Sequence, residues 1–235
     1  MGNNIYVSAI IVAGGSGKRF GSITKKQFIE ISGKPVLYYS IDAFEKCELV
    51  KEIVVVLPGE NLEFYDTTIS KIKRFKKVQK VIEGGRERQD SVYNGLKNVS
   101  DKTDIVLVHD AARPLVNVKI INQIIDQSIK SDCAICAVPI NDTVKLSNGA
   151  RLIEKTVPRE GLWLAQTPQG FKYELIMSAF QNAYDKDLIG TDESSLVERL
   201  GIKPAIVEGP KYNLKITKPE DLKLAEFYLK ENTNV

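Results

Sequence analysis

The chain of 235 residues carries 33 lysines and arginines and 30 aspartates and glutamates, which leaves a net charge of +3. These charges are interspersed, and no apolar stretch reaches the roughly twenty residues needed to cross a bilayer, so neither a nucleic-acid nor a membrane partner is expected. Three cysteines, few and odd in number, are typical of a reducing compartment and indicate a cytoplasmic protein.

Apolar strand-like runs alternate along the chain with stretches of helical period. Strands are expected at Val7–Val12 and at residues 53–57, 105–108 and 134–138. Helices are expected at residues 35–47, from about Asp90 onward, at 117–130 with an isoleucine stripe that includes Ile129, and at 218–230 behind a capping box of Thr217 and Glu220. This alternation predicts an α/β fold in one domain, residues 1–235, with a Rossmann-like, mostly parallel sheet flanked by helices.

A glycine-rich segment follows the first expected strand directly. Glycines admit positive φ and bring bare N–H groups close to phosphate oxygens, so the segment containing Ala13, Gly14, Gly15 and Gly17 is a candidate nucleotide site. A glycine turn needed only for backbone geometry is the alternative.

The cations that follow favour a polyanionic ligand. Lys18, Arg19, Lys25 and Lys26 come within the next residues. A P-loop would need Ser or Thr after Gly17-Lys18, and a dinucleotide fingerprint would need Gly or Ala where Arg19 and Phe20 stand. A nucleoside triphosphate held without a P-loop lysine is the better hypothesis.

The segment Gly84-Gly-Arg-Glu-Arg-Gln-Asp-Ser91 combines free N–H groups, guanidinium groups and the start of a helix. Gly85, Arg88 and Ser91 are candidates for contacts with a base or an anion. Alternatively, Asp90 or Ser91 serves only as the helix N-cap.

The segment His109-Asp-Ala-Ala-Arg-Pro114 follows the third expected strand, at a carboxyl end where open α/β sheets bind ligands. Asp110 is a candidate for a ribose hydroxyl or Mg²⁺, and Arg113 for a phosphate or for orienting the loop. A structural Asp–Arg pair is the alternative.

Residues 141–164 break the alternation. Two strand-like pieces flank Ser147-Asn-Gly149, which predicts a β-hairpin arm inserted in the domain. Such a ribbon buries little surface by itself, so we expect it to pack on a second subunit in a homodimer. Just upstream, Cys133 and Cys136 are expected in one strand with their thiols on opposite faces, as core residues.

Taken together, these segments closely resemble the 2-C-methyl-D-erythritol 4-phosphate cytidylyltransferases of the non-mevalonate isoprenoid pathway. The resemblance covers nearly the whole chain. The matching residues are Ala13-Gly-Gly-Ser-Gly-Lys-Arg19, Lys26-Gln-Phe28, Gly84-Gly-Arg-Glu-Arg88, Val106-Leu-Val-His-Asp-Ala-Ala-Arg-Pro114, Asp142-Thr143, Gln166-Thr-Pro-Gln169, Thr191-Asp192 and Lys215-Ile-Thr217.

The resemblance implies that CMP is transferred from CTP to methylerythritol phosphate, with Mg²⁺ on the triphosphate. It implies that Arg19 and Lys26 stabilise the transition state. Thr143, Arg159 and Lys215 would hold the methylerythritol phosphate, with Thr143 and Arg159 reaching across the dimer. The remaining residues implied to contact the nucleotide are Ala13 to Gly15, Gly85, Ser91, Asp110 and Arg113.

The chemistry agrees with a site that lacks a general base. A phosphate monoester loses its second proton near pH 6, so the nucleophile is already anionic at neutral pH. The chain has a single histidine, and no hydrolase-type triad can be assembled. Positioning and cations are what such a transfer requires.

Two positions depart from the family pattern, and two other functions compete. Lys25 stands where the family often has proline, and Pro158 where many members have an acid. A ribitol 5-phosphate cytidylyltransferase is the nearest alternative, and a catalytically silent nucleotide-sensing module is the second. Retention of Arg19, Lys26 and Lys215 argues against the sensor.

Overall fold

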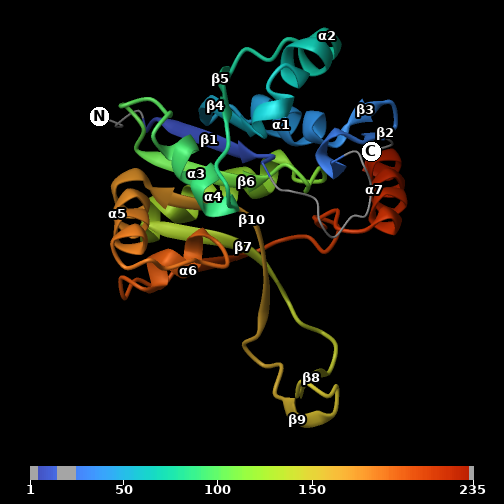
Figure 1. The fold of residues 1–235 in the computed structure, drawn as a ribbon, viewed down its shortest axis with the longest axis vertical. Helices are drawn as coiled ribbons and strands as arrows, with labels where there is room; N and C mark the ends of the chain where they lie inside the picture. Colours follow the sequence, from blue (N-terminus) through green and yellow to red (C-terminus); the bar gives the residue numbers. More distant parts are fainter. Residues whose placement is uncertain (1–4, 15–24, 233–235) are drawn as a thin grey trace.

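The structure, a computed structural model, describes residues 5–14 and 25–232. Its centre is a seven-stranded sheet of order β11-β7-β10-β6-β1-β4-β5, with helices on both faces (Figure 1). The strands are β1 (Val7–Val12), β4 (Val50–Leu57), β5 (Val78–Glu83), β6 (Ile105–Asp110), β7 (Cys133–Pro139), β10 (Trp163–Lys172) and β11 (Ala205–Glu208). Only β10 runs antiparallel to its neighbours, so the expected α/β fold with a mostly parallel sheet is confirmed.

Strand β1 is buried on both faces, which explains why its sequence is a continuous apolar run. Ala9 and Ile11 join the hydrophobic cluster under α1 (Val36–Lys46) and α4 (Val118–Ser131). Ile10 and Val12 join the cluster on the opposite face, under α3 (Arg88–Leu96), α5 (Tyr173–Asp185) and α6 (Glu193–Glu198). The two layers of helices therefore fix the central strands, whose carboxyl ends carry the candidate site.

Further elements lie outside the central sheet, in two separate places (Figure 1). The short strands β2 (Glu30–Ile31) and β3 (Lys34–Pro35) form a second small sheet, against which α7 (Pro219–Asn232) packs. Single turns of 3-10 helix lie at Lys26–Phe28 and Gly59–Asn61, and a π-helical turn at Tyr65–Ile69 precedes the short α2 (Ser70–Ile72).

All four expected strands and all four expected helices are present, with differences at their ends. Helix α4 begins after Asn117, whose side chain accepts a hydrogen bond from the N–H of Ile120 at 3.0 Å. Ile129 was expected in the buried stripe but is 38% exposed, and Ser128 beside it is the last buried residue of α4. Cys133 and Cys136 lie in opposite hydrophobic clusters, as expected.

The capping box expected at Glu220 is wrong by one residue. The carboxylate of Asp221 accepts hydrogen bonds from the backbone N–H of Thr217 at 2.7 Å and of Lys218 at 2.8 Å. Asp221 is selected because α7 begins at Pro219, so that its side chain rather than that of Glu220 faces back to these amides.

The arm ends two residues earlier than expected, because Trp163 and Leu164 pair with β7 as part of β10. Residues 141–162 leave the sheet after β7 and project far from it (Figure 1). At its far end, β8 (Val144–Ser147) and β9 (Ile153–Val157) pair antiparallel, which confirms the hairpin. The side chain of Asn148 accepts hydrogen bonds from the N–H groups of Ala150 and Leu152, and Arg151 takes the positive φ of the turn, at 61°. The turn is therefore longer than an Asn-Gly pair by itself requires.

Candidate active site

Three loops converge where the parallel strands end. Ala13 and Gly14 follow β1, Gly84 and Gly85 follow β5, and Asp110 closes β6. The N–H of Ala111 donates to the carbonyl of Val12 at 3.0 Å, which joins two of these strand ends. Strands β4 and β5 lie on one side of β1, and the chain then crosses to the other side of β1 to form β6. The site therefore lies at the switch point of the sheet, where the order of strands reverses.

Asp110 is the centre of a cluster of charged side chains that the fold brings together from distant segments. Its Oδ1 accepts from Arg88 Nε at 3.0 Å, and its Oδ2 lies 2.6 Å from Lys215 Nζ and 4.0 Å from Arg113 Nε. Glu193 completes the Asp110 cluster by accepting from Arg88 Nη1 at 2.5 Å and Nη2 at 3.0 Å.

Electrostatics keep the Asp110 carboxylate ionised. Burial by itself would raise the pKa of Asp110, but the charges of Arg88, Lys215 and Arg113 outweigh burial and hold the pKa well below its usual range. Burial would likewise lower the pKa of Arg88, but Asp110 and Glu193 raise it above the ordinary arginine value. Asp110 and Arg88 therefore both stay charged at neutral pH.

Glu193 is a member of the Asp110 cluster that sequence reasoning missed. Asp192, the residue before it, caps α6 by accepting from the N–H of Ser195 at 2.9 Å, and Glu193 stands in the first turn of that helix. An acid in the first turn of a helix needs no partner to be explained. Its pairing with Arg88 depends on tertiary contact, which no local pattern signals.

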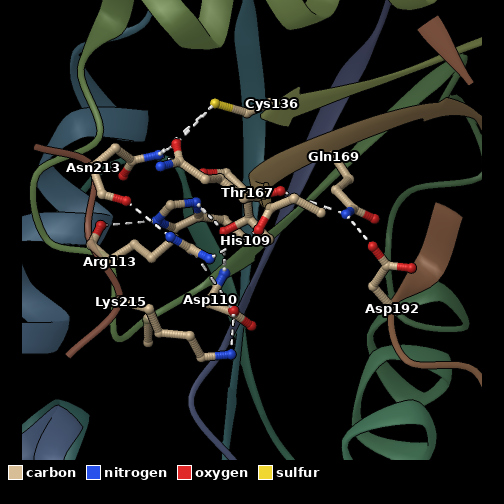
Figure 2. A network of polar contacts seen from close by, with 12 residues as sticks. His109, Asp110, Arg113, Cys136, Thr167, Gln169, Asp192, Asn213 and Lys215 are labelled. Atoms are coloured by element: carbon tan, nitrogen blue, oxygen red, sulfur yellow. Dashed lines mark hydrogen bonds and ion pairs between the residues drawn. The ribbon is translucent and has the colours of Figure 1, made fainter. Parts of the chain in front are cut away.

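His109 is buried within a chain of hydrogen bonds that also holds Asp110 (Figure 2). The N–H of Asp110 donates to Thr167 Oγ1 at 3.0 Å, and Thr167 Oγ1 lies 3.1 Å from His109 Nδ1. His109 Nε2 lies 3.1 Å from the carbonyl of Arg113, which can only accept, so Nε2 carries the proton and Nδ1 accepts from the threonine. Burial lowers the pKa of His109 to about 3, so the ring is neutral at physiological pH.

Arg113 is bound to the protein rather than open to solvent. Its Nη1 donates to the carbonyl of Asn213 at 2.8 Å and its Nη2 to that of Ala165 at 3.4 Å. Asn213 in turn donates to Gln166 Oε1 at 3.0 Å and to the carbonyl of Thr167 at 2.9 Å (Figure 2). These contacts match the loop-orienting alternative for Arg113, and they fix the segment that carries Lys215.

Ser91 lies beneath two of the glycine loops. Its Oγ accepts from the N–H of Gly85 at 3.0 Å and donates to the carbonyl of Glu87 at 3.1 Å. A Cβ on Gly14 would approach Ser91 Oγ to 2.9 Å, and one on Gly84 to 2.7 Å, so a side chain at either position would push the hydroxyl out of its present contacts. The N-cap of α3 is Glu87, so neither Asp90 nor Ser91 is the cap; α3 begins earlier than expected, at Arg88.

Part of the expected site lies outside the described residues. Gly15, Gly17, Lys18 and Arg19 belong to that segment. Both ends of the segment are described, and the buried Gln27 joins them by donating from Nε2 to the carbonyl of Ala13 at 2.5 Å.

Lys26 lies directly beside this contact, in the turn Lys26–Phe28, so the expected catalytic lysine is anchored next to the glycine loop. Lys25, which replaces the proline frequent at this position, forms an ion pair with Glu60. The departure at residue 25 therefore adds a contact between this turn and the segment that follows β4.

The arm carries two expected substrate residues away from the Asp110 cluster. Thr143 precedes β8 and Arg159 follows β9, and both side chains are exposed. Within the described part of the chain, the guanidinium of Arg159 donates to the carbonyl of Asn141 at the base of the arm. Of the three expected substrate residues, only Lys215 thus lies beside Asp110 of the same chain.

Comparison with known proteins gives one consistent result. Residues 7–231 match the family model described as 2-C-methyl-D-erythritol 4-phosphate cytidylyltransferase. A protein of that name from Syntrophus aciditrophicus is 45% identical, and the match covers 96% of each chain. One from Alkaliphilus oremlandii is 43% identical, and the match covers 98% of each chain. The crystal structure of 4-diphosphocytidyl-2C-methyl-D-erythritol synthase from Anaerococcus prevotii has a TM-score of 0.83 at 28% identity, covering 97% of this chain and 100% of that one.

Proposed function

Because the chain belongs to the 2-C-methyl-D-erythritol 4-phosphate cytidylyltransferase family, we propose that the Asp110 cluster and the glycine loops around it form its CTP site. The enzyme transfers CMP from CTP to methylerythritol phosphate and releases pyrophosphate. The observation that carries the site assignment is the cluster itself: an ionised Asp110 among Arg88, Arg113 and Lys215 at the switch point of the sheet.

The nucleotide enters this proposal through the strand-end loops. The N–H groups of the segment from Ala13 to Gly17, with Lys18, meet the triphosphate. Gly85, whose N–H is bonded to Ser91, offers its carbonyl to the base. Ser91 and Arg113 support these loops through the contacts they make with protein groups. Asp110 faces the ribose and the phosphates.

The transfer step needs no protein base. An oxygen of the sugar phosphate attacks the α-phosphorus of CTP, and the bond from that phosphorus to the pyrophosphate oxygen breaks. The nucleophile is anionic near neutral pH. His109 would be a poor base, because it is neutral, buried and hydrogen-bonded at both ring nitrogens. Arg19 and Lys26 are proposed to stabilise the charge that builds on the phosphate oxygens.

Mg²⁺ is proposed as the cofactor, held mainly by the phosphates of CTP. Within the described ranges, no group of three or more His, Cys, Asp or Glu side chains has the geometry of a protein-only metal site. Magnesium commonly binds through one or two carboxylates plus substrate phosphates, and the ionised Asp110 fits that role. The ion would supply charge neutralisation on the triphosphate.

The arm is proposed to complete the sugar-phosphate site in a homodimer. Leu152 is 65% exposed and Ile153 64%, apolar surface that a second subunit would cover. Thr143 and Arg159 would then reach the partner's site, where Lys215 of that subunit binds the same phosphate.

Cytoplasmic localisation is also proposed. The three cysteines of the described chain are free and buried, which suits a reducing compartment. No helix among the described residues is both long and apolar enough to span a bilayer.

Pyrophosphate release tests the proposed function. The enzyme with CTP and Mg²⁺ is expected to release pyrophosphate with methylerythritol phosphate and not with ribitol 5-phosphate. Release with ribitol 5-phosphate alone would reassign the substrate, and no release with either would favour a nucleotide-sensing module.

Replacing Arg159 with alanine is expected to raise the KM for methylerythritol phosphate about 10- to 100-fold, because a charge-assisted phosphate contact contributes about 1.5–3 kcal/mol. The KM for CTP should change little. Steady-state kinetics with each substrate varied in turn provide the measurement, and Lys155→Ala, another exposed cation of the arm, is the matched control. An unchanged KM for the sugar phosphate would remove Arg159 from the site.

A further inference from the structure

The side chain of Glu193 is only 2% exposed, although it lies in the first turn of a short surface helix. Both of its oxygens accept from one guanidinium, that of Arg88, at 2.5 and 3.0 Å. The third nitrogen of that guanidinium, Nε, donates to Asp110 Oδ1 at 3.0 Å. Arg88 thus bridges two carboxylates and uses all three of its nitrogens to do so.

Helix α6 holds Glu193 in place through contacts with the central sheet. Asp192 caps the helix and accepts from Nε2 of Gln169 at 2.8 Å (Figure 2). Gln169 Oε1 accepts from the N–H of Ser194 at 3.1 Å. Gln169 belongs to β10, the strand adjacent to β6. Glu193 and Asp110 are therefore anchored to neighbouring strands, as precise positioning of a site requires.

Stability by itself is a weak explanation for this arrangement. Replacing a buried ion pair by apolar residues of similar volume is often neutral or stabilising, because the charges lose solvation. What the bridge does achieve is orientation. The carboxylate of an aspartate turns easily about its last torsion, and Arg88 fixes Oδ1 so that Oδ2 faces Lys215 Nζ at 2.6 Å.

Glu193 also keeps the two Nη groups of Arg88 away from Asp110. With both carboxylates present, Arg88 gives Asp110 a single Nε contact. Without Glu193, the two Nη groups would lose their partner, and Asp110 would be the nearest carboxylate for a bidentate pair. Such a pair would turn Oδ2 away from Lys215.

We propose that Glu193 is a positioning residue of the transfer reaction. Acting through Arg88, it holds the Asp110 carboxylate so that Lys215 is set to meet the incoming sugar phosphate. This inference rests on the proposed function of the Asp110 cluster and adds a residue that touches neither substrate.

The test is the isosteric substitution Glu193→Gln in the full-length enzyme. We expect kcat to fall about 10- to 100-fold, by analogy with the loss found when a group that orients a metal ligand is removed. CTP affinity, measured by isothermal titration calorimetry, is expected to be no weaker than in the wild type, because loss of a negative charge favours a polyanion. Glu198→Gln, an exposed acid at the end of the same helix, is the matched control and should leave both quantities unchanged.

A double-mutant cycle with Asp110→Asn separates positioning from a purely structural role. If Glu193 acts through Asp110, adding Glu193→Gln to Asp110→Asn should lower kcat no further. Independent, additive losses would overturn the inference, and so would wild-type kcat in a folded Glu193→Gln enzyme or loss of CTP binding in proportion to kcat. Should Glu193→Gln fail to fold, Glu193→Asp keeps the charge but shortens the reach, and it should show the same kinetic pattern.

Failure of this inference is distinguishable from failure of the proposed function. A wild-type enzyme that is silent with CTP and methylerythritol phosphate would reject the function. An active wild type with an equally active Glu193→Gln variant would reject only the role of Glu193.

Discussion

Replacing Asp110 with asparagine is expected to lower the free energy of unfolding at neutral pH by about 3–5 kcal/mol and to remove most of the turnover. Asparagine is nearly the same shape, but it leaves Arg88, Lys215 and Arg113 without the carboxylate that they share. Arg113, the most buried of the three, would lose its counter-charge, which is costly, whereas Arg88 keeps Glu193. Lys215 would lose its orientation. Denaturant unfolding and steady-state kinetics measure the two effects.

The loss of unfolding free energy in Asp110→Asn is expected to be larger at neutral pH than under acid. The pKa of Asp110 is held below its usual range in the folded state, whereas an unfolded aspartate titrates near pH 4. Ionised Asp110 therefore stabilises the fold above about pH 4, and that contribution is lost as pH falls from there toward the lower folded-state value. Asparagine does not titrate, so the difference in the free energy of unfolding between wild type and variant should become smaller under acid.

The matched control for this substitution is Asp126→Asn, on the exposed side of α4. It should leave both stability and turnover unchanged. If Asp110→Asn were as stable and as active as the wild type at neutral pH, the Asp110 cluster would be neither an electrostatic centre of the fold nor part of the active site.

Replacing Arg19 with alanine is expected to lower kcat about 10²- to 10³-fold, the range seen when one donor to a developing charge is removed. CTP affinity should fall far less, because the glycine loop and the other cations still bind the ground state. Single-turnover kinetics and a direct measurement of CTP binding separate the two quantities. This expectation comes from the sequence motif, since Arg19 lies outside the described residues.

Arg74→Ala, at an exposed position before the amino end of β5 and not at the carboxyl ends that carry the site, is the control for loss of a positive charge. If Arg19→Ala weakened CTP binding as strongly as turnover, Arg19 would be a ground-state contact. An unchanged kcat would remove it from the catalytic role.

The sequence was a good guide to the central strands, because each is a continuous apolar run that only a doubly covered sheet accommodates. It did not identify β10, where Gln166, Thr167 and Gln169 interrupt the apolar pattern. These polar side chains are buried because they bond to Asp110, Asn213 and Asp192, partners that lie far away in the chain. The edge strands β5 and β11 were missed as well, because their half-exposed residues carry a weak apolar signal.

By itself the sequence determined the α/β class, the glycine loop after β1, the hairpin and the candidate residues Asp110 and Arg113, because periodicity and residue chemistry are local properties. Lys215 became a candidate through the resemblance to the family. Only the tertiary structure decided that Arg88 links Glu193 to Asp110, and that Asp110 in turn holds Lys215. Arg88 and Glu193 are 105 positions apart, as are Asp110 and Lys215. Pairings across such distances follow from the order of strands and the packing of helices upon them, which no short segment of the chain encodes.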